Sequence, residues 1–254
     1  MKIVDLSKPI QYNSGDPWFM KVKIKHKSHA KSKWLIRALG LPFRLFPSKF
    51  QGWADDTIQK MGVHSTTHLD APWHYGPECE GKKAKTIDEV PLEWCYGDGV
   101  VIDMSHKNDF EPITRDDLAN FVQENEIEIK DGTIVLIRTG RDKLMGTKAF
   151  AEKGTGVDAE ATRWLLEQGV KVTGIDQWGW DLPLKYLIKK AKETNNPELF
   201  WQGHVVGIDK EYCHLEQLTN LGALPLKGFK VALFPLKIVG ASAAPARVVA
   251  MLEE

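Results

Sequence analysis

The sequence predicts a single α/β domain with a largely buried sheet. The first observation is the alternation of strand and helix patterns from residue 99 onward, which is typical of α/β proteins. The second is the length of 254 residues, which suits one domain with a substantial core. The third is an ordinary globular composition, with 43% hydrophobic and 27% charged residues.

Short apolar runs predict the strands of this domain. A first short strand is expected around a polar turn, over residues 2–6 and 9–10. The later runs lie at residues 99–103, 133–138, 170–175 and 229–234. Their length and their content of valine and isoleucine favour strands over helices. The order of the strands in the sheet does not follow from these patterns.

The helices between these strands are predicted by their end signals. Thr114 and Asp117 have the spacing of a capping box at a helix start. Asp158 is a favourable N-cap, and Gly169 suits the position just after a helix C-terminus. Pro183 suits the start of a further helix. The expected helices therefore cover residues 115–125, 159–168 and 184–193.

Residues 14–57 differ in character from the rest of the chain. Residues 20–27 alternate apolar and basic side chains, which predicts a half-exposed strand or arm. The apolar stretch 34–46 that follows is interrupted by Gly40 and Pro42. One interpretation is an irregular piece packed on the core. The other is an insertion that forms a mobile lid or a subunit-contact arm and walls an apolar substrate pocket.

The charge balance disfavours some partners. Lys plus Arg and Asp plus Glu number 34 each, so the formal net charge is zero. Bulk attraction to nucleic acid or to an anionic membrane is therefore not expected, and a nucleic-acid binder would have to rely on residues 21–33. A compact neutral protein is also easily driven to self-associate, which favours an oligomer.

The cysteines and the N-terminal sequence favour a cytoplasmic protein. Cys79, Cys95 and Cys213 are widely spaced and form no C-x-x-C pair, so we expect free thiols in a reducing compartment. The first residues contain no apolar signal-peptide core. The apolar stretch 34–46 is too short to span a bilayer.

The densest cluster of metal-competent side chains lies in the eleven residues from His64 to His74. It contains three histidines and one aspartate: His64, His68, Asp70 and His74. Histidine nitrogen and carboxylate oxygen suit zinc, and also manganese or iron. A chance cluster is the alternative, but the whole chain has only 8 histidines. This density predicts a metal site.

The backbone of this cluster is predicted to be a bent loop at a strand end. A helix is disfavoured because residues 65–67 are poor helix formers and Pro72 restricts the residue before it. In a straight strand, the Cα atoms of His64 and His68 would be about 13 Å apart, too far to share an ion easily. His74 could be a ligand, or instead a neutral imidazole that acts as a general base.

The segment from His64 to His74 resembles the signature H-x-G-T-H-x-D-x-P-x-H of the cyclase family of metal-dependent hydrolases. That family includes bacterial kynurenine formamidase (arylformamidase), isatin hydrolase and zinc-dependent lactone hydrolases. Every metal-competent position matches, as do Thr67 and Pro72. Thr66 stands where the family usually has glycine, and its Cβ restricts φ, so the loop could be shaped differently. The chain also lacks a G-x-S-x-G nucleophile elbow, a Walker loop and a G-x-G-x-x-G motif.

The resemblance extends over most of the chain outside residues 14–57. Further segments that resemble the family lie at residues 5–10, 174–176, 203–218 and 242–247. The resemblance implies a single domain over residues 1–254, with a swivelling β/β/α-type fold in which helices flank a central mixed sheet. It also implies a homodimer or homotetramer, in which the 14–57 segment could reach a neighbouring subunit.

Position by position, the resemblance implies a metal centre with ligands from two regions of the chain: His64, His68, Asp70, His204 and Glu216. Asp70 would bridge a first ion to a second one. Some relatives have glutamine at the Glu216 position and hold one ion, so the glutamate here favours two. Zn²⁺ is the expected metal and Mn²⁺ the alternative. Without the resemblance, His214 would be as good a candidate as His204.

The resemblance implies an acid/base role for His74 and the hydrolysis of an amide, lactam or lactone. A bound ion lowers the pKa of its water toward about 7, which provides hydroxide at neutral pH. A second ion could polarise the scissile carbonyl, and His74 would protonate the leaving group. The competing hypothesis is a catalytically silent metal- or ligand-binding module, which the presence of His74 and Glu216 disfavours.

The expected substrate is a small aryl or cyclic amide. Four tryptophans flank the proposed site segments and could stack on a flat substrate: Trp73, Trp178, Trp180 and Trp201. Packing in the core is an equally good interpretation for each, since the chain has nine tryptophans. N-formylkynurenine is the default substrate by family analogy, and isatin-like or lactone substrates are the alternatives.

Overall fold

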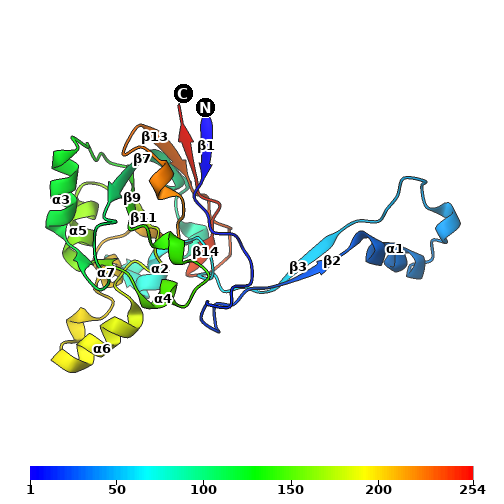
Figure 1. The fold of residues 1–254 in the computed structure, drawn as a ribbon, viewed down its shortest axis with the longest axis horizontal. Coiled ribbons are helices and arrows are strands. Elements are labelled where there is room, and N and C mark those ends of the chain that lie inside the picture. Colours follow the sequence, from blue (N-terminus) through cyan, green and yellow to red (C-terminus); the bar gives the residue numbers. More distant parts are fainter. Residues whose placement is uncertain (254) are drawn as a thin grey trace.

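The computed structural model describes residues 1–253, and a nine-stranded mixed sheet forms its centre (Figure 1). In spatial order its strands are β1 (Lys2–Asp5), β15 (Val249–Leu252), β13 (Phe229–Ala232), β7 (Tyr96–Asp103), β9 (Ile134–Arg138), β11 (Val172–Ile175), β12 (Cys213–Glu216), β4 (His68–Asp70) and β14 (Ala243–Pro245). The four strands from β7 to β12 are mutually parallel, and every other pairing is antiparallel. The expected α/β fold with a mixed sheet is confirmed.

Helices lie against the sheet and at its ends. They are α1 (His29–Ala38), α2 (Pro72–Tyr75), α3 (Arg115–Glu124), α4 (Ala149–Glu152), α5 (Ala159–Glu167), α6 (Leu184–Thr194) and α7 (Gln202–Asp209). Short 3₁₀ turns occur at Phe43–Leu45, Ile87–Glu89, Leu92–Cys95, Arg141–Leu144, Pro197–Leu199 and Leu221–Ala223. Three short hairpins or bridges complete the set: β2 (Lys23–Lys27) with β3 (Asp55–Lys60), β5 (Glu78–Cys79) with β6 (Lys82–Lys83), and β8 (Pro112–Ile113) with β10 (Gly156–Val157).

The sheet is buried on both faces. On one face, α3 and α5 pack through Leu118 and Leu165 against alternate residues of the central strands, such as Val135 and Ile137. On the other face, Leu136 and its neighbours contact the N-terminal segment and the strands that close the sheet at its edges. Burial on both faces explains the continuous apolar run at residues 134–137, because parallel central strands have no solvent-exposed side.

The predicted helix ends agree with the structure. Thr114 and Asp117 form a reciprocal capping box at the start of α3. The Asp158 side chain accepts a hydrogen bond from the Ala161 N–H at the start of α5. Gly169 follows the end of that helix with φ of +87°, a conformation that favours glycine. The expected strand at residues 9–10 is wrong, since β1 ends at Asp5.

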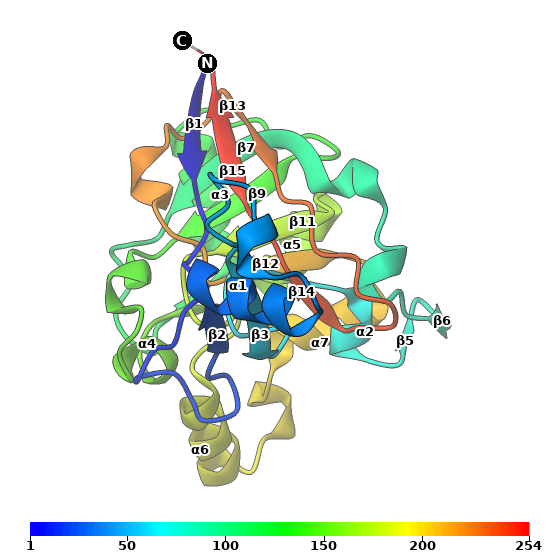
Figure 2. The ribbon, with the colours of Figure 1, turned by 90° about the vertical axis from the view of Figure 1, so that its right-hand side faces the viewer.

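Residues 23–60 extend away from the body as an arm, made of the hairpin β2–β3 with α1 beyond it (Figures 1 and 2). The interpretation of residues 34–46 as a piece packed on the core is wrong, because they lie at the far end of this arm. An edge-to-face series of rings holds the end together: Trp34, Phe43, Phe46 and Phe50. Within residues 1–253, no helix combines the length and the apolar character needed to cross a membrane.

Candidate metal centre and substrate pocket

The register between β4 and β12 brings four metal-competent side chains together. His68 and Asp70 are two residues apart on β4 and therefore share one face of the sheet. His214 and Glu216 have the same spacing on β12. The two strands pair antiparallel, with His214 opposite Asp70 and Glu216 opposite His68. All four side chains are buried or nearly so.

The flanks of β4 add two histidines that face the pocket. His64 lies in the turn before the strand, and its Nδ1 is 2.9 Å from Asp70 Oδ1. His74 lies on α2, and its Nε2 is 3.7 Å from Asp70 Oδ2. Pro72 begins this helix, and Ala71 before it is extended, with φ −90° and ψ 160°. The expected bent loop is therefore found around His64, whereas His68 and Asp70 lie on the strand.

Thr66 fits the turn without a glycine-like conformation. It is absent from the described residues with positive φ, so its Cβ costs nothing at this position. Its hydroxyl donates to the Lys8 carbonyl at 3.2 Å. Next to it, the Thr67 hydroxyl donates to the Gln217 carbonyl and accepts from the Lys8 N–H. The two threonines thus tie the metal-competent turn to the N-terminal segment and to the residue after Glu216.

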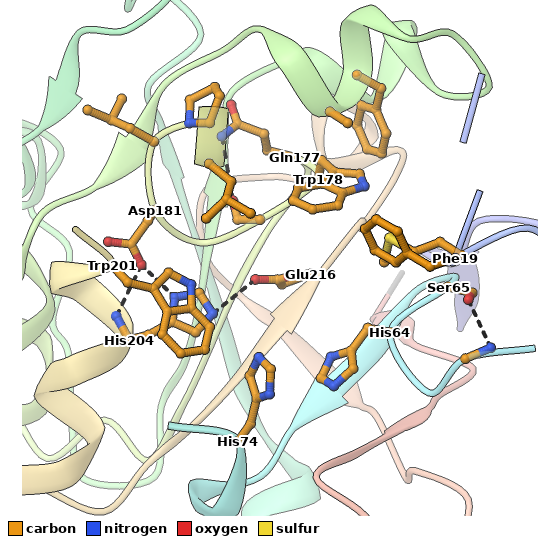
Figure 3. Close-up of a pocket in the computed structure, with 18 of the residues that line it drawn as sticks. Phe19, His64, Ser65, His74, Gln177, Trp178, Asp181, Trp201, His204 and Glu216 are labelled. Atoms are coloured by element: carbon orange, nitrogen blue, oxygen red, sulfur yellow. Dashed lines mark hydrogen bonds and ion pairs between the residues drawn. The ribbon is translucent and has the colours of Figure 1, made fainter. Parts of the chain in front are cut away.

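His204 enters the cluster from α7. Its Nε2 is 3.6 Å from Glu216 Oε1, and its Nδ1 contacts the Asp181 carboxylate. Asp181 also accepts hydrogen bonds from the backbone N–H groups of Gly203 and His204 at the start of the helix. The Trp201 ring stacks on the His204 imidazole, with centroids 4.2 Å apart. His204 is therefore held from three sides with its Nε2 directed at Glu216 (Figure 3).

The atoms at the centre of this cluster fit a divalent cation. Within residues 1–253, four of them are buried without a hydrogen bond: His68 Nε2, His214 Nε2 and both carboxylate oxygens of Asp70. They lie close together, with 3.2 Å from His68 Nε2 to Asp70 Oδ1 and 3.1 Å from His214 Nε2 to Asp70 Oδ2. Buried lone pairs that face one another without a hydrogen-bond donor are costly in free energy unless a cation lies between them.

The outer nitrogen of each buried histidine is occupied, which directs the other nitrogen inward. His68 Nδ1 donates to the Thr66 carbonyl at 2.6 Å. His204 Nδ1 faces Asp181. His214 Nδ1 is 3.2 Å from the Tyr212 hydroxyl, which itself donates to a backbone carbonyl and so can accept. Metal-binding histidines usually have such a partner on the second nitrogen, which fixes the tautomer.

The pKa values of the cluster follow from burial and from mutual charge. Burial would raise the pKa of Asp70, but the neighbouring His64 and His68 outweigh it and lower that pKa well below 3.8. Burial lowers the pKa of His74 to about 4, against the opposing effect of Asp70. For His214, burial is outweighed by the adjacent carboxylates of Asp70 and Glu216, which raise its pKa to about 9.

A cavity of about 450 Å³ opens onto the exposed side of the cluster (Figure 3). Its floor includes His64, His74, His204 and Glu216, and its walls are mainly apolar. The apolar wall residues are Phe19, Met20, Phe150, Trp178, Leu182, Pro183, Leu184, Phe200 and Trp201. A concave, largely apolar space with a few convergent polar groups is the usual form of a small-molecule site.

Two of the four tryptophans expected at the substrate lie elsewhere. Trp178 and Trp201 line the cavity. Trp180 is fully buried, where it stacks on His214 and its indole N–H donates to Thr162. Trp73 is also outside the cavity lining and is partly exposed. Trp73 lies on α2 beside His74, and Trp180 lies between Gly179 and Asp181, so each has a sequence neighbour that lines the cavity although its own ring does not.

Sequence reasoning left two residues of the site without a role. Asp181 orients His204, and no pattern around it indicates this. Without the family resemblance, His214 is as good a candidate as His204, and the structure brings both histidines to Asp70 and Glu216. Its spacing of two from Glu216 was the available signal, since residues i and i+2 of a strand share a face.

Fold and site together define an α/β protein with a buried histidine and carboxylate cluster suited to a divalent metal, at the floor of an apolar pocket. Residues 4–182 match the family model described as "Putative cyclase". The chain belongs to the cyclase family.

The relatives of this chain include hydrolases. Isatin hydrolase of Roseibium aggregatum is 28% identical over 204 residues, which cover 76% of this chain and 73% of that protein. Kynurenine formamidase of Bacillus cereus is 26% identical over 189 residues, with 74% and 76% covered. The solved structure of isatin hydrolase A from Ralstonia solanacearum has a TM-score of 0.73 at 26% identity and covers 99% of this chain and 92% of that one.

Proposed function

We propose that this protein is a metal-dependent hydrolase that cleaves an amide, lactam or lactone bond in a small aromatic or cyclic substrate. The observation that carries the proposal is the set of unpaired, buried lone pairs on His68, Asp70 and His214 beneath an apolar cavity. Hydrolysis of a C–N bond, as in the arylformamidases, is the proposed reaction, with N-formylkynurenine as the default substrate. An isatin- or lactone-type substrate is the alternative, supported by the similarity to isatin hydrolase.

The proposed ligands are those that surround Asp70. His64 and His68 would hold one ion with Asp70, and His204 and Glu216 would hold a second one that shares Asp70. A bound divalent ion supplies a Lewis acid and a water of lowered pKa. Nitrogen and carboxylate donors suit Zn²⁺, which we propose as the metal, and also Mn²⁺.

His74 is the proposed acid/base. Its ring lies at the cavity floor, and its centroid is 4.2 Å from that of His64 and 5.2 Å from that of Trp201. It therefore borders both the metal-competent face and the aromatic wall. From this position His74 can take a proton from the attacking water and deliver it to the departing nitrogen or oxygen.

The aromatic wall is proposed to select flat substrates. Trp178 and Trp201 line the cavity, and Phe150 and Phe19 extend its apolar surface. A ring held between these side chains would place its reactive carbonyl over the polar floor. The geometry therefore favours an aryl or fused-ring amide over an extended peptide.

The function is tested by a substrate panel on protein stripped of metal and then reloaded. N-formylkynurenine, isatin and a series of aryl lactones would be assayed with Zn²⁺ and separately with Mn²⁺. We expect turnover of at least one class, loss on chelation and recovery on reloading. Stoichiometric metal binding without turnover of any compound would indicate instead a silent metal-binding module.

We also propose that the arm of residues 23–60 packs against a second copy of this chain in a homodimer or homotetramer. Residues 14–57 contain nine Lys or Arg and three Asp, a net charge of +6. The remaining 25 Lys or Arg and 31 Asp or Glu give the rest of the chain −6. Leu39 on the arm is 75% exposed and Trp34 is 66% exposed. An apolar, basic arm on an acidic body favours contact with another copy of that body.

A further inference from the structure

His214 is the member of the metal cluster that has no role in the proposed ligand sets. It lies on β12 directly opposite Asp70, and its side chain is fully buried. Its Nε2 is 3.1 Å from Asp70 Oδ2 and 3.4 Å from Glu216 Oε1. Despite these short separations, Nε2 makes no hydrogen bond within residues 1–253. An unpartnered buried nitrogen aimed between two carboxylates has the position of a ligand atom.

The surroundings of His214 fix its ring in a ligand orientation. The Trp180 indole stacks on one face of the imidazole, with centroids 5.3 Å apart and planes at 14°. The outer Nδ1 lies 3.2 Å from the Tyr212 hydroxyl and 3.3 Å from the Tyr75 hydroxyl. Since Tyr212 donates to the Gly203 carbonyl, its oxygen can accept the Nδ1 proton of His214. When a metal ion displaces the Nε2 proton, the lone pair of Nε2 points toward Asp70.

We propose that His214 is a ligand of the second ion, together with Asp70, His204 and Glu216. One ligand atom from each of these four residues can be chosen so that all lie within 4.8 Å of one another. This inference rests on the proposed function, since it assumes that the cluster binds metal. It adds that this ion has four protein ligands, which is the closed coordination of structural zinc sites.

The two ion positions then differ in what they offer the substrate. The position held by Asp70, His204, His214 and Glu216, called the closed position, has only buried ligands. His64 and His74, on the other side of Asp70, are partly exposed and line the cavity. His204 and Glu216 also line the cavity, but four protein ligands leave the closed position no free coordination site, so only an ion beside His64 would be open to water and substrate. An ion at the closed position would instead hold Asp70 in place and polarise its carboxylate.

The test compares His214→Leu with the wild type and with His106→Leu, which removes an exposed imidazole remote from the cluster. Each metal-free protein is titrated with Zn²⁺ by equilibrium dialysis, and bound metal is counted by mass spectrometry. We expect two ions in the wild type and in His106→Leu. In His214→Leu, the second ion should be lost or bound at least tenfold more weakly.

Substitution with Co²⁺ gives a readout that needs no variant. A four-coordinate tetrahedral ion absorbs visible light much more strongly than a five- or six-coordinate one. The wild type should therefore show a strongly absorbing Co²⁺ at the closed position. In His214→Leu, the absorption contributed by that ion should be lost, whatever the ion beside His64 contributes.

Three outcomes would overturn the proposal. His214→Leu could bind two ions with wild-type affinity, or the wild type could show no tetrahedral Co²⁺ band. The wild type could also bind one ion and His214→Leu two, which would mean that His214 is a buried cation that excludes the second ion. In these cases the proposed hydrolase still stands. A wild type that binds no divalent ion would remove both proposals together.

Discussion

Glu216 of β12 lies directly opposite His68 of β4, and the His68 Nε2 is 3.5 Å from Glu216 Oε2. These residues are 148 positions apart in the sequence, so the contact is created by strand pairing alone. The same register sets His214 against Asp70. A shift of one residue would turn one strand's pair of side chains to the opposite face of the sheet. The metal centre thus depends on the register of this antiparallel pair.

Removal of the His74 imidazole should separate catalysis from metal binding. We expect His74→Ala to lower kcat by roughly 10²- to 10⁴-fold, the usual contribution of a general acid or base. Metal content should equal that of the wild type, because the Nε2 of His74 is 3.7 Å from the nearer Asp70 oxygen and other residues supply the ligands. Steady-state rates and metal analysis on one preparation check this. Loss of an ion from His74→Ala would make this residue a ligand instead.

Asp181 should control metal affinity without contacting the ion. Its carboxylate holds the outer nitrogen of His204, so Asp181→Asn leaves that imidazole poorly oriented. A change of this kind typically weakens metal binding by about 10- to 100-fold. Competition with a chromophoric chelator measures the affinity. Asp209→Asn is the control: Asp209 lies at the exposed end of α7, the helix that carries His204, and this variant should bind metal as the wild type does. Equal affinities in the two variants would contradict this role.

Asp176 should make stability depend on pH. Burial raises the pKa of this carboxyl to about 6, although it accepts hydrogen bonds from Thr139 and Gly140. The folded state therefore retains a proton that the unfolded chain loses near pH 3.8, the ordinary value. This contribution is complete below pH 3.8 and is lost as the pH rises through about 6.

Urea unfolding of the wild type and of Asp176→Asn measures this effect. The difference in unfolding free energy, wild type minus variant, should fall by about 2 kcal/mol between pH 4 and pH 7, at 1.36 kcal/mol per pKa unit. Other titrating groups are common to both proteins and cancel in the difference. A difference that stays constant over this range would show that Asp176 is ionised throughout.

The arm should determine the oligomeric state. Leu39 and Leu45 are exposed on the arm, and glutamate at both positions would place charge in the proposed contact. We expect the double variant Leu39→Glu, Leu45→Glu to be monomeric in light scattering where the wild type is a dimer or tetramer. Leu92→Glu changes a leucine on the body that is 66% exposed and serves as the control. A monomeric wild type, or an unchanged mass in the double variant, would contradict the arm contact.

Local features of the sequence were sufficient for much of the fold. Capping at Thr114 and at Asp158 depends on residues within one turn, so helix starts follow from short patterns. Strand β9 was predictable because both of its faces are buried and its sequence is continuously apolar. The direction of the arm was not predictable, since no local pattern encodes whether an apolar segment packs on the core of its own chain or on another subunit.

The site was predictable only where its residues are neighbours in the chain. His64 and Asp70 share a dense motif, and their approach follows from a turn before a short strand. The partnership with β12 requires the strand order, which short patterns do not contain. Asp181 illustrates the same limit, because it acts on His204 across a 23-residue separation. His214 and Glu216 are two residues apart on β12, so their shared face would have followed from a predicted strand there. The mixed sequence of β12 gives only a weak indication of a strand.

Asp70 is proposed to join two divalent ions beneath the cavity. The most direct measurement is the metal content of the untreated protein and of Asp70→Ala, determined by mass spectrometry after gel filtration without chelator. We expect two ions per chain in the wild type and loss of both in Asp70→Ala, because both positions depend on this carboxylate. A wild type without divalent metal, or an Asp70→Ala variant that keeps its full complement, would contradict it.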